Sequence, residues 1–265
     1  MEANSQRQPL NIKAELEELR RMHLSEVSQS TVNILLLGQV GVGKTELCKT
    51  ARAPILIDSF DPGGTKHLGE EIKKGRIIVD SRYENEDSSH PQAYSTWERE
   101  FLRRREIGLF SQIGTYVIDS FTMWLEALKN AIAVRKGRAE KLLQLQDWQV
   151  MGNVLRDMVL LATSLPCDFI LTGHLLLVKE EVSGRMIARF NTIPSLQVNI
   201  PLLFDEIYIL QTEEKADGVE RRLLTSPTGR YEARTRIGAH RFSLYEKPDI
   251  KYLLNKAGYP AEDKA

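Results

Sequence analysis

Residues 38–45 read Gly-Gln-Val-Gly-Val-Gly-Lys-Thr and match the phosphate-binding pattern G-x-x-x-x-G-K-[ST] completely. The pattern follows an apolar run and opens a helix-forming run, which is the strand–turn–helix setting that it requires. Its glycines let successive backbone N–H groups turn toward phosphate oxygens. Lys44 is expected to reach the β- and γ-phosphates of ATP, and the Thr45 hydroxyl to ligate Mg²⁺. The expected nucleotide-binding residues are Gly38, Gln39, Val40, Gly41, Val42, Gly43, Lys44, Thr45 and Glu46.

Two other apolar runs end in aspartates. "PILIDSFD" carries Asp58 and Asp61, and "TYVIDS" carries Asp119. A phosphate loop needs an acid at the end of a neighbouring strand to hold the Mg²⁺ shell. The later run is the better placed for this role, so we assign Asp119 to Mg²⁺ beside Thr45. The earlier run is better placed to present a carboxylate to the attacking water, and there we choose Asp61 over Asp58 as the general base.

The run "CDFILTGH" predicts a further strand with Thr172 and His174 at its end. A polar side chain at this sheet edge is placed to touch the γ-phosphate and report its loss. The alternative is a histidine that ends a strand without contacting any ligand.

Composition excludes several classes of protein. Lys plus Arg and Asp plus Glu number 36 each among 265 residues, so no global field recruits nucleic acid or an anionic membrane. Cys48 and Cys167 lack metal-ligand spacing and favour a reducing compartment. No apolar run approaches the ~20 residues of a membrane helix, and the N-terminus lacks the apolar segment of a signal peptide. We expect a cytoplasmic protein that does not enter membranes.

The order of elements predicts an α/β fold. Apolar strands alternate with helical patterns as far as the strand at 167–174, and a β-rich part follows. In that part we expect a hairpin around Ser183-Gly184 and short strands at 203–210, 221–226 and 230–236. The fold is therefore a mostly parallel sheet flanked by helices and extended by antiparallel C-terminal strands. We expect an N-terminal tail with an amphipathic helix (1–30), one core domain (31–250) and a C-terminal tail (251–265).

Several motifs in this order resemble a known family: "GQVGVGKT", "ILIDSFDPGG", "YVIDSFTMW", "DFILTGH", "IPLLFDEIYIL" and "YEARTRIG". The chain is similar, over about residues 31–250, to the RecA-like core ATPases encoded by phages, which are of the AAA/ASCE type. That group includes single-strand annealing and recombination-mediator proteins. The resemblance implies an ATPase with an inserted strand, a site between subunits of a ring or filament, and a location in the host cytoplasm.

Carried over by position, the resemblance gives Lys44 and Thr45 to phosphate and Mg²⁺, and makes Asp119 the Walker B acid. His174 stands where many RecA-like proteins have a glutamine. Their catalytic acid is usually a glutamate, so Asp61 has to substitute for it with a shorter arm. The resemblance therefore implies slow hydrolysis.

The segment "YEARTR" holds two arginines, Arg234 and Arg236, that face one side of the expected strand. The resemblance implies that Arg236 is a finger reaching the γ-phosphate of a neighbouring subunit, with Arg234 as its partner. The alternative is a solvated strand edge that uses basic residues to prevent aggregation.

Two basic segments are candidates for contacts with single-stranded DNA, in regions where RecA-like proteins place their DNA-binding loops. Their residues are Arg135, Lys136, Arg138 and Lys141 in the first segment, and Arg185 and Arg189 in the second.

The leading interpretation is thus an ATP-hydrolysing protein that acts on single-stranded DNA in phage recombination or annealing. A helicase, translocase or packaging motor would use the same site. A nucleotide-dependent scaffold with little turnover, or a small-molecule kinase, are the alternatives from other classes.

Overall fold

The computed structural model describes residues 12–27, 31–137, 143–180, 184–216 and 218–264. The chain divides into two compact units, Met1–Ser30 and Thr31–Ala265. Within the described residues, no helix combines the length and the apolar character needed to cross a bilayer.

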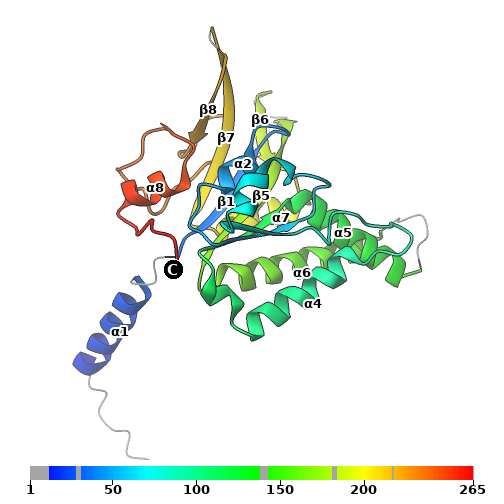
Figure 1. Cartoon of the computed structure of the whole chain (residues 1–265), viewed down its shortest axis with the longest axis horizontal. Coiled ribbons are helices and arrows are strands. Elements are labelled where there is room, and N and C mark those ends of the chain that lie inside the picture. The colour runs from blue at the N-terminus through cyan, green and yellow to red at the C-terminus, as the bar shows by residue number, and fades with distance from the viewer. Residues whose placement is uncertain (1–11, 28–30, 138–142, 181–183, 217, 265) are drawn as a thin grey trace, which may run out of the picture. The chain divides into compact units, whose positions relative to one another are not determined.

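One mixed sheet forms the centre of the second unit (Figure 1). Its order is β3-β2-β4-β5-β1-β7-β8-β9, with β6 paired to β5 beyond this path. The strands β3, β2, β4, β5, β1 and β7 run parallel, whereas β6, β8 and β9 are antiparallel to their neighbours. The strands are β1 (Asn33–Gly38), β2 (Ile55–Ser59), β3 (Ile77–Asp80), β4 (Thr115–Asp119), β5 (Asp168–Lys179), β6 (Met186–Phe190), β7 (Glu206–Lys215), β8 (Gly218–Leu224) and β9 (Tyr245–Glu246).

The order of these strands confirms the predicted fold class. β5 lies between β1, which leads into the phosphate loop, and β4, which ends in Asp119. This is the inserted strand that the RecA-like resemblance implies. The central strands are buried on both faces, which explains why they read as continuous apolar runs rather than as alternating patterns.

The helices of the second unit cover both faces of the sheet. They are α2 (Lys44–Cys48), α3 (Gly69–Lys73), α4 (Ala93–Glu106), α5 (Phe121–Arg135), α6 (Leu145–Thr163), α7 (Pro194–Leu202) and α8 (Ile250–Ala257), with 3-10 turns η1 (Lys66–Leu68) and η2 (Leu109–Gln112). Figure 1 shows α4, α5 and α6 stacked together on one side of the strands. Their large side chains, including Trp97, Trp124 and Leu155, form one core with that face. The opposite core contains residues of α2 and α8, including Leu47 and Leu253.

The expected strand at 230–236 is wrong. The structure has only isolated bridges there, from Tyr231 to Ala188 of β6 and from Arg234 to Ile207 of β7. The segment therefore crosses from one strand to another instead of running along either. Ala233 is buried in the core between the two bridges, which fixes the segment in this path.

The segment 251–265, expected as a tail, forms part of the second unit. The α8 helix buries Ile250, Leu253, Leu254 and Ala257 against the sheet. The Asp249 side chain caps its first turn by accepting a hydrogen bond from the Tyr252 N–H.

The N-terminal unit is described by itself. Its helix α1 (Ile12–Val27) lies within the segment 1–30, where an amphipathic helix is expected, and the rest of that segment lies outside the described residues. The side chains of Ile12, Leu16, Leu19 and Met22 are all exposed along this helix.

Candidate active site

The phosphate loop joins β1 to α2 with glycine geometry. Gly43 caps the helix at φ 99°, and a Cβ there would lie 2.9 Å from Nε of Arg221. A side chain at this position would therefore be strained by its backbone and crowded by its surroundings. The loop needs this glycine.

Lys44 points back into the loop. Its Nζ donates hydrogen bonds to the carbonyl oxygens of Gly38 at 3.2 Å and Gln39 at 3.0 Å. Burial lowers the pKa of Lys44, although the nearby Asp119 and Asp61 carboxylates raise it in part. A lysine that is poorly solvated and held only by neutral carbonyls gains strongly from an incoming phosphate.

Asp119 accepts hydrogen bonds from one helix, α2, and one strand, β5. The Thr45 hydroxyl donates to its Oδ2 at 2.7 Å, and the Thr172 hydroxyl of β5 donates to its Oδ1. Mg²⁺ in such sites is held by one or two protein oxygens, several waters and the phosphates of the substrate. The adjacent oxygens of Thr45 and Asp119 fit that requirement.

Asp61 lies on the same edge of the sheet. Ser120, the residue after Asp119, donates a hydrogen bond to Oδ1 of Asp61 at 2.7 Å. Burial raises the pKa of Asp61, the Ser120 hydrogen bond lowers it, and the charge of Asp119 raises it. A carboxylate with a raised pKa beside the metal ligand is suited to accept a proton from water.

Asp58 has a different environment. It is fully buried, where the Arg104 guanidinium donates to its Oδ1 at 2.8 Å and the Tyr116 hydroxyl donates to its Oδ2 at 2.7 Å. Burial raises its pKa to about 6, against the opposing effect of Arg104. Asp58 therefore belongs to a core network that also contains Asp80, and it does not line the nucleotide pocket.

His174 is paired in register with Gly38, so it stands at the level of the phosphate loop. β5 continues beyond it to Lys179, which means that the expected strand end is wrong and the strand is longer. The Nδ1 atom of His174 lies 2.9 Å from the Thr122 hydroxyl oxygen. Burial lowers the pKa of His174 and the nearby Lys44 charge lowers it further, so the neutral imidazole is favoured.

The phosphate loop and the carboxylates beside it line one pocket of about 590 Å³. Its walls include Lys44, Thr45, Glu46, Asp61, Asp119 and His174. The volume falls in the range of small-molecule sites.

The pocket also holds residues that sequence patterns did not indicate. Arg221 of β8 donates from Nε to the Val42 carbonyl at 2.8 Å and faces the pocket. His67, which lies 3.4 Å from the Glu46 carboxylate, closes another side. Arg221 has no motif around it and reaches the loop only because β8 pairs with β7 at Thr212.

Arg234 and Arg236 lie away from the phosphate loop of their own chain. Arg234 donates to the carbonyls of Pro201 and Phe204 at the end of α7, and Arg236 contacts the Leu202 carbonyl at 3.3 Å. The Arg236 backbone N–H donates to Glu206 at the start of β7, four residues before Leu210, which pairs with Gly38 of the loop.

The predicted DNA-contacting residues lie on two elements. Arg135 ends α5 and Lys136 follows it, whereas Arg138 and Lys141 lie outside the described residues. Arg189 belongs to β6, and Arg185 immediately precedes that strand.

A family model described as an AAA domain matches residues 30–237, which is more than half of the chain. The chain belongs to this AAA domain family. It is therefore a P-loop NTPase of the AAA type, as the loop, the Asp119 contacts and the strand order also indicate.

Two solved structures are similar to the chain at low sequence identity. A KaiC-like protein from the archaeon Pyrococcus horikoshii is 16% identical with a TM-score of 0.38, covering 77% of this chain and 82% of that one. The flagellar accessory protein FlaH from Methanocaldococcus jannaschii is 10% identical with a TM-score of 0.39, covering 76% and 79%. No curated protein matches the sequence.

Proposed function

We propose that this AAA-type NTPase binds ATP with Mg²⁺ and hydrolyses it slowly, with Asp61 as the general base. The observation that supports this most directly is the placement of Asp61 beside the Thr45–Asp119–Thr172 group. Ser120 connects Asp119 with Asp61, because it is the next residue after Asp119 and its hydroxyl donates a hydrogen bond to the Asp61 carboxylate.

The proposed reaction is attack of water on the γ-phosphorus. The bond from the γ-phosphorus to the bridging oxygen breaks, ADP leaves with that oxygen, and the water proton passes to Asp61. Lys44 exchanges the Gly38 and Gln39 carbonyls for β- and γ-phosphate oxygens. Bound Mg²⁺ would supply charge neutralisation for the phosphates, held by Thr45 and Asp119. The short side chain of Asp61 supports a slow rate.

Turnover of ATP by the purified chain tests this assignment. We expect Asp61→Asn to reduce phosphate release by at least about a hundredfold, since general-base catalysis contributes that much. Asp119→Asn should also reduce phosphate release, because the proposed Mg²⁺ site loses its carboxylate. Asp157→Asn is the matched control, because Asp157 is an exposed aspartate of α6 that forms an ion pair with Arg156, far along the chain from the phosphate loop. Normal turnover in Asp61→Asn would exclude Asp61 as the base.

The same assay separates the other classes. Phosphate release without a phosphorylated product excludes a kinase. Tight ATP binding without phosphate release, even with DNA present, would leave the nucleotide-dependent scaffold as the remaining interpretation. A strand-displacement assay distinguishes a helicase or packaging motor.

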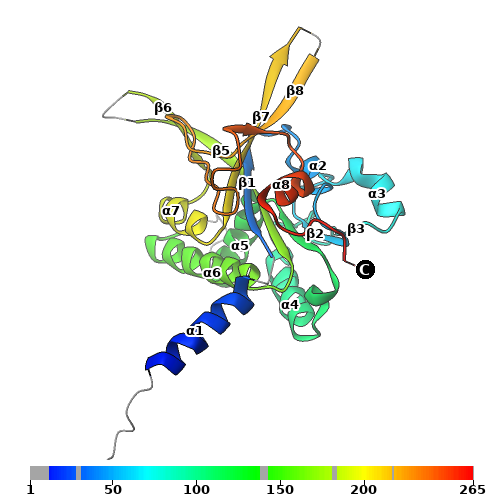
Figure 2. The same ribbon diagram turned by 90° about the vertical axis from the view of Figure 1, so that its left-hand side faces the viewer.

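We further propose that the chain acts on single-stranded DNA, in the setting of phage recombination or annealing that the sequence resemblance implies. Two hairpins, β5–β6 and β7–β8, extend beyond the rest of the sheet (Figures 1 and 2). Arg189 lies on the first of them. The prediction is that ATP with Mg²⁺ increases affinity for single-stranded DNA; equal affinity with and without nucleotide would contradict the coupling.

A ring or filament is part of this proposal, with Arg236 as the finger. Arg236 is half exposed, and it is separated from the loop of its own chain by the length of β1, about 13 Å for four residues. Mixing Lys44→Ala with Arg236→Ala chains tests the arrangement. Each variant alone should be inactive, whereas the mixture should regain activity at sites formed by one chain of each kind. A mixture as inactive as its components would contradict a finger acting between subunits.

A further inference from the structure

A second pocket lies beside the active site, between β5 and the β7–β8 hairpin. It has a volume of about 450 Å³ and takes part of its wall from Gln39–Val42 of the phosphate loop. Two arginines and two tyrosines line it: Arg222, Arg230, Tyr231 and Tyr245. We call this the arginine–tyrosine pocket.

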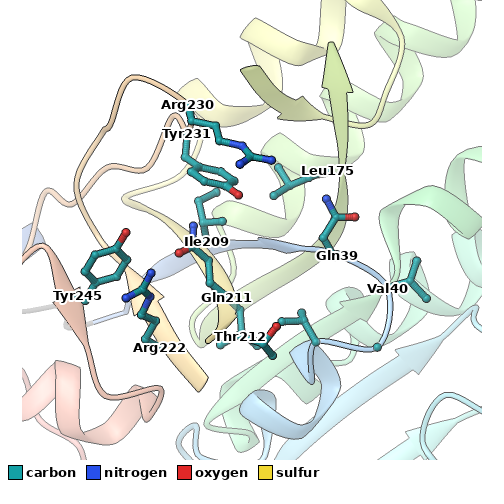
Figure 3. Close-up of a pocket in the computed structure, with 13 residues that line it drawn as sticks. Gln39, Val40, Leu175, Ile209, Gln211, Thr212, Arg222, Arg230, Tyr231 and Tyr245 are labelled. Atoms are coloured by element: carbon teal, nitrogen blue, oxygen red, sulfur yellow. The ribbon is translucent and has the colours of Figure 1, made fainter. Parts of the chain in front are cut away.

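Figure 3 shows how these side chains surround the hollow. Arg230 and Tyr231 lie along one side, Arg222 and Tyr245 along another, and Gln39 approaches from the phosphate loop. The Arg222 guanidinium stacks 4.0 Å from the Tyr245 ring centroid, and Arg230 lies 5.5 Å from the Tyr231 ring centroid. Glu213 holds Arg222 in place at 2.9 Å.

The chemistry of this lining selects an anion that carries a flat ring. None of the described residues that line the pocket is acidic, in contrast to the active site with Glu46, Asp61 and Asp119. Arginines suit phosphate, and tyrosine faces suit bases, which is the combination that binds single-stranded nucleic acid.

We propose that the arginine–tyrosine pocket binds a nucleotide unit of single-stranded DNA. Arg222 and Arg230 contact phosphate, and Tyr231 offers its ring to a base. This inference rests on the proposed function and names a DNA-contacting surface different from the segments at 135–141 and 185–189.

The position of the pocket links it to ATP. Val40 and Gly41 line both pockets, so one short backbone segment separates DNA from nucleotide. The neighbouring residues Arg221 and Arg222 of β8 line the active site and the arginine–tyrosine pocket respectively. Lys44 holds the Gln39 carbonyl, and ATP would release it. Each ligand should therefore change the affinity of the other by the same factor.

Fluorescence anisotropy of a labelled oligothymidylate, measured over a range of salt concentrations, tests the proposal. We expect Arg222→Gln and Arg230→Gln each to weaken binding and to reduce the slope of log affinity against log salt by about 0.7, the loss of one phosphate contact. Tyr231→Leu should weaken binding by about fivefold to a hundredfold with little change in slope. Arg105→Gln on α4 is the charge-matched control, because Arg105 is exposed and lies outside both pockets.

Arg222 also forms an ion pair with Glu213, so Arg222→Gln can alter the β7–β8 hairpin. Arg230→Gln is therefore the second, independent test of the pocket. The thermal unfolding midpoint is measured for every variant. Slopes unchanged in both arginine variants, with normal oligothymidylate binding, would overturn the pocket and leave the proposed function intact. Competition by thymidine monophosphate as effective as that by the oligonucleotide, at equal phosphate concentration, would assign the pocket to free nucleotides instead. Absence of any DNA binding by the wild type would overturn both DNA proposals, whereas its ATP turnover separately tests the hydrolytic one.

Discussion

Replacing Arg104 by leucine should destabilise the chain in a manner that depends on pH. Arg104 is buried and donates to both Asp58 and Asp80, so its loss leaves two buried carboxylates without their shared cation. Breaking a buried ion pair by removing one partner costs about 3–5 kcal/mol. Asp80 keeps its hydrogen bonds from Arg82 and Tyr83, whereas Asp58 keeps only that from Tyr116.

The titration of Asp58 sets the pH dependence. Burial raises its folded pKa from the ordinary 3.8 to about 6, so the folded wild type binds more protons than the unfolded chain in this window. The contribution of Asp58 therefore makes wild-type stability fall as pH rises toward 6 and level off above it. Without Arg104 the pKa of Asp58 rises further, and the variant continues to lose stability above pH 6.

The stability difference between wild type and Arg104→Leu should therefore widen by up to about 1.4 kcal/mol per pH unit above pH 6, or about 3 kcal/mol by pH 8. Urea unfolding at pH 6, 7 and 8 measures it. Arg103→Leu is the control, because Arg103 is an exposed neighbour that pairs with Glu100, and it should cost under about 1 kcal/mol at each pH. A difference that stays constant from pH 6 to pH 8 would refute this reasoning.

Three further predictions concern the active site. Thr172→Val should lower the free energy of unfolding by about 1–3 kcal/mol and raise the Mg²⁺ concentration for half-maximal turnover, because a buried Asp119 oxygen loses its donor; an unchanged Mg²⁺ requirement would contradict this. Ser120→Ala should raise the pKa of Asp61 and move the acidic limb of the turnover profile to higher pH, and a shift in the opposite direction would argue against Asp61 as the base. Gly43→Ala should weaken ATP affinity by about tenfold or more in a titration with a fluorescent analogue, given its φ of 99°, and wild-type affinity would disprove the backbone requirement.

Much of the site follows from local sequence. The strand–loop–helix around Lys44 follows from one motif. Asp61, Asp119 and His174 lie together because the parallel pairing of neighbouring strands ends at the same edge of the sheet. Both inferences require only that the strands run parallel, because the carboxyl ends of parallel strands meet at the same edge of the sheet.

Contacts set by distant pairing were not predictable in the same way. Arg221 reaches the phosphate loop through the register of β8 on β7, which no local pattern encodes. The arginines of "YEARTR" alternate as in a strand, but the burial of Ala233 carries the chain across the sheet instead. The α8 helix did carry local signals, since Asp249 and Gly258 mark its ends and its apolar residues recur at helical spacing.

The length of β5 has a mechanical consequence. Its first part is held between β1 and β4 in the sheet, whereas among the described residues Leu175–Lys179 pairs with β6 alone. The five residues beyond His174 span about 17 Å, so a tilt of about 10° at the imidazole would sweep the Lys179 end through about 3 Å. A small displacement at His174, which lines the active-site pocket, is thus amplified at the far end of the β5–β6 hairpin.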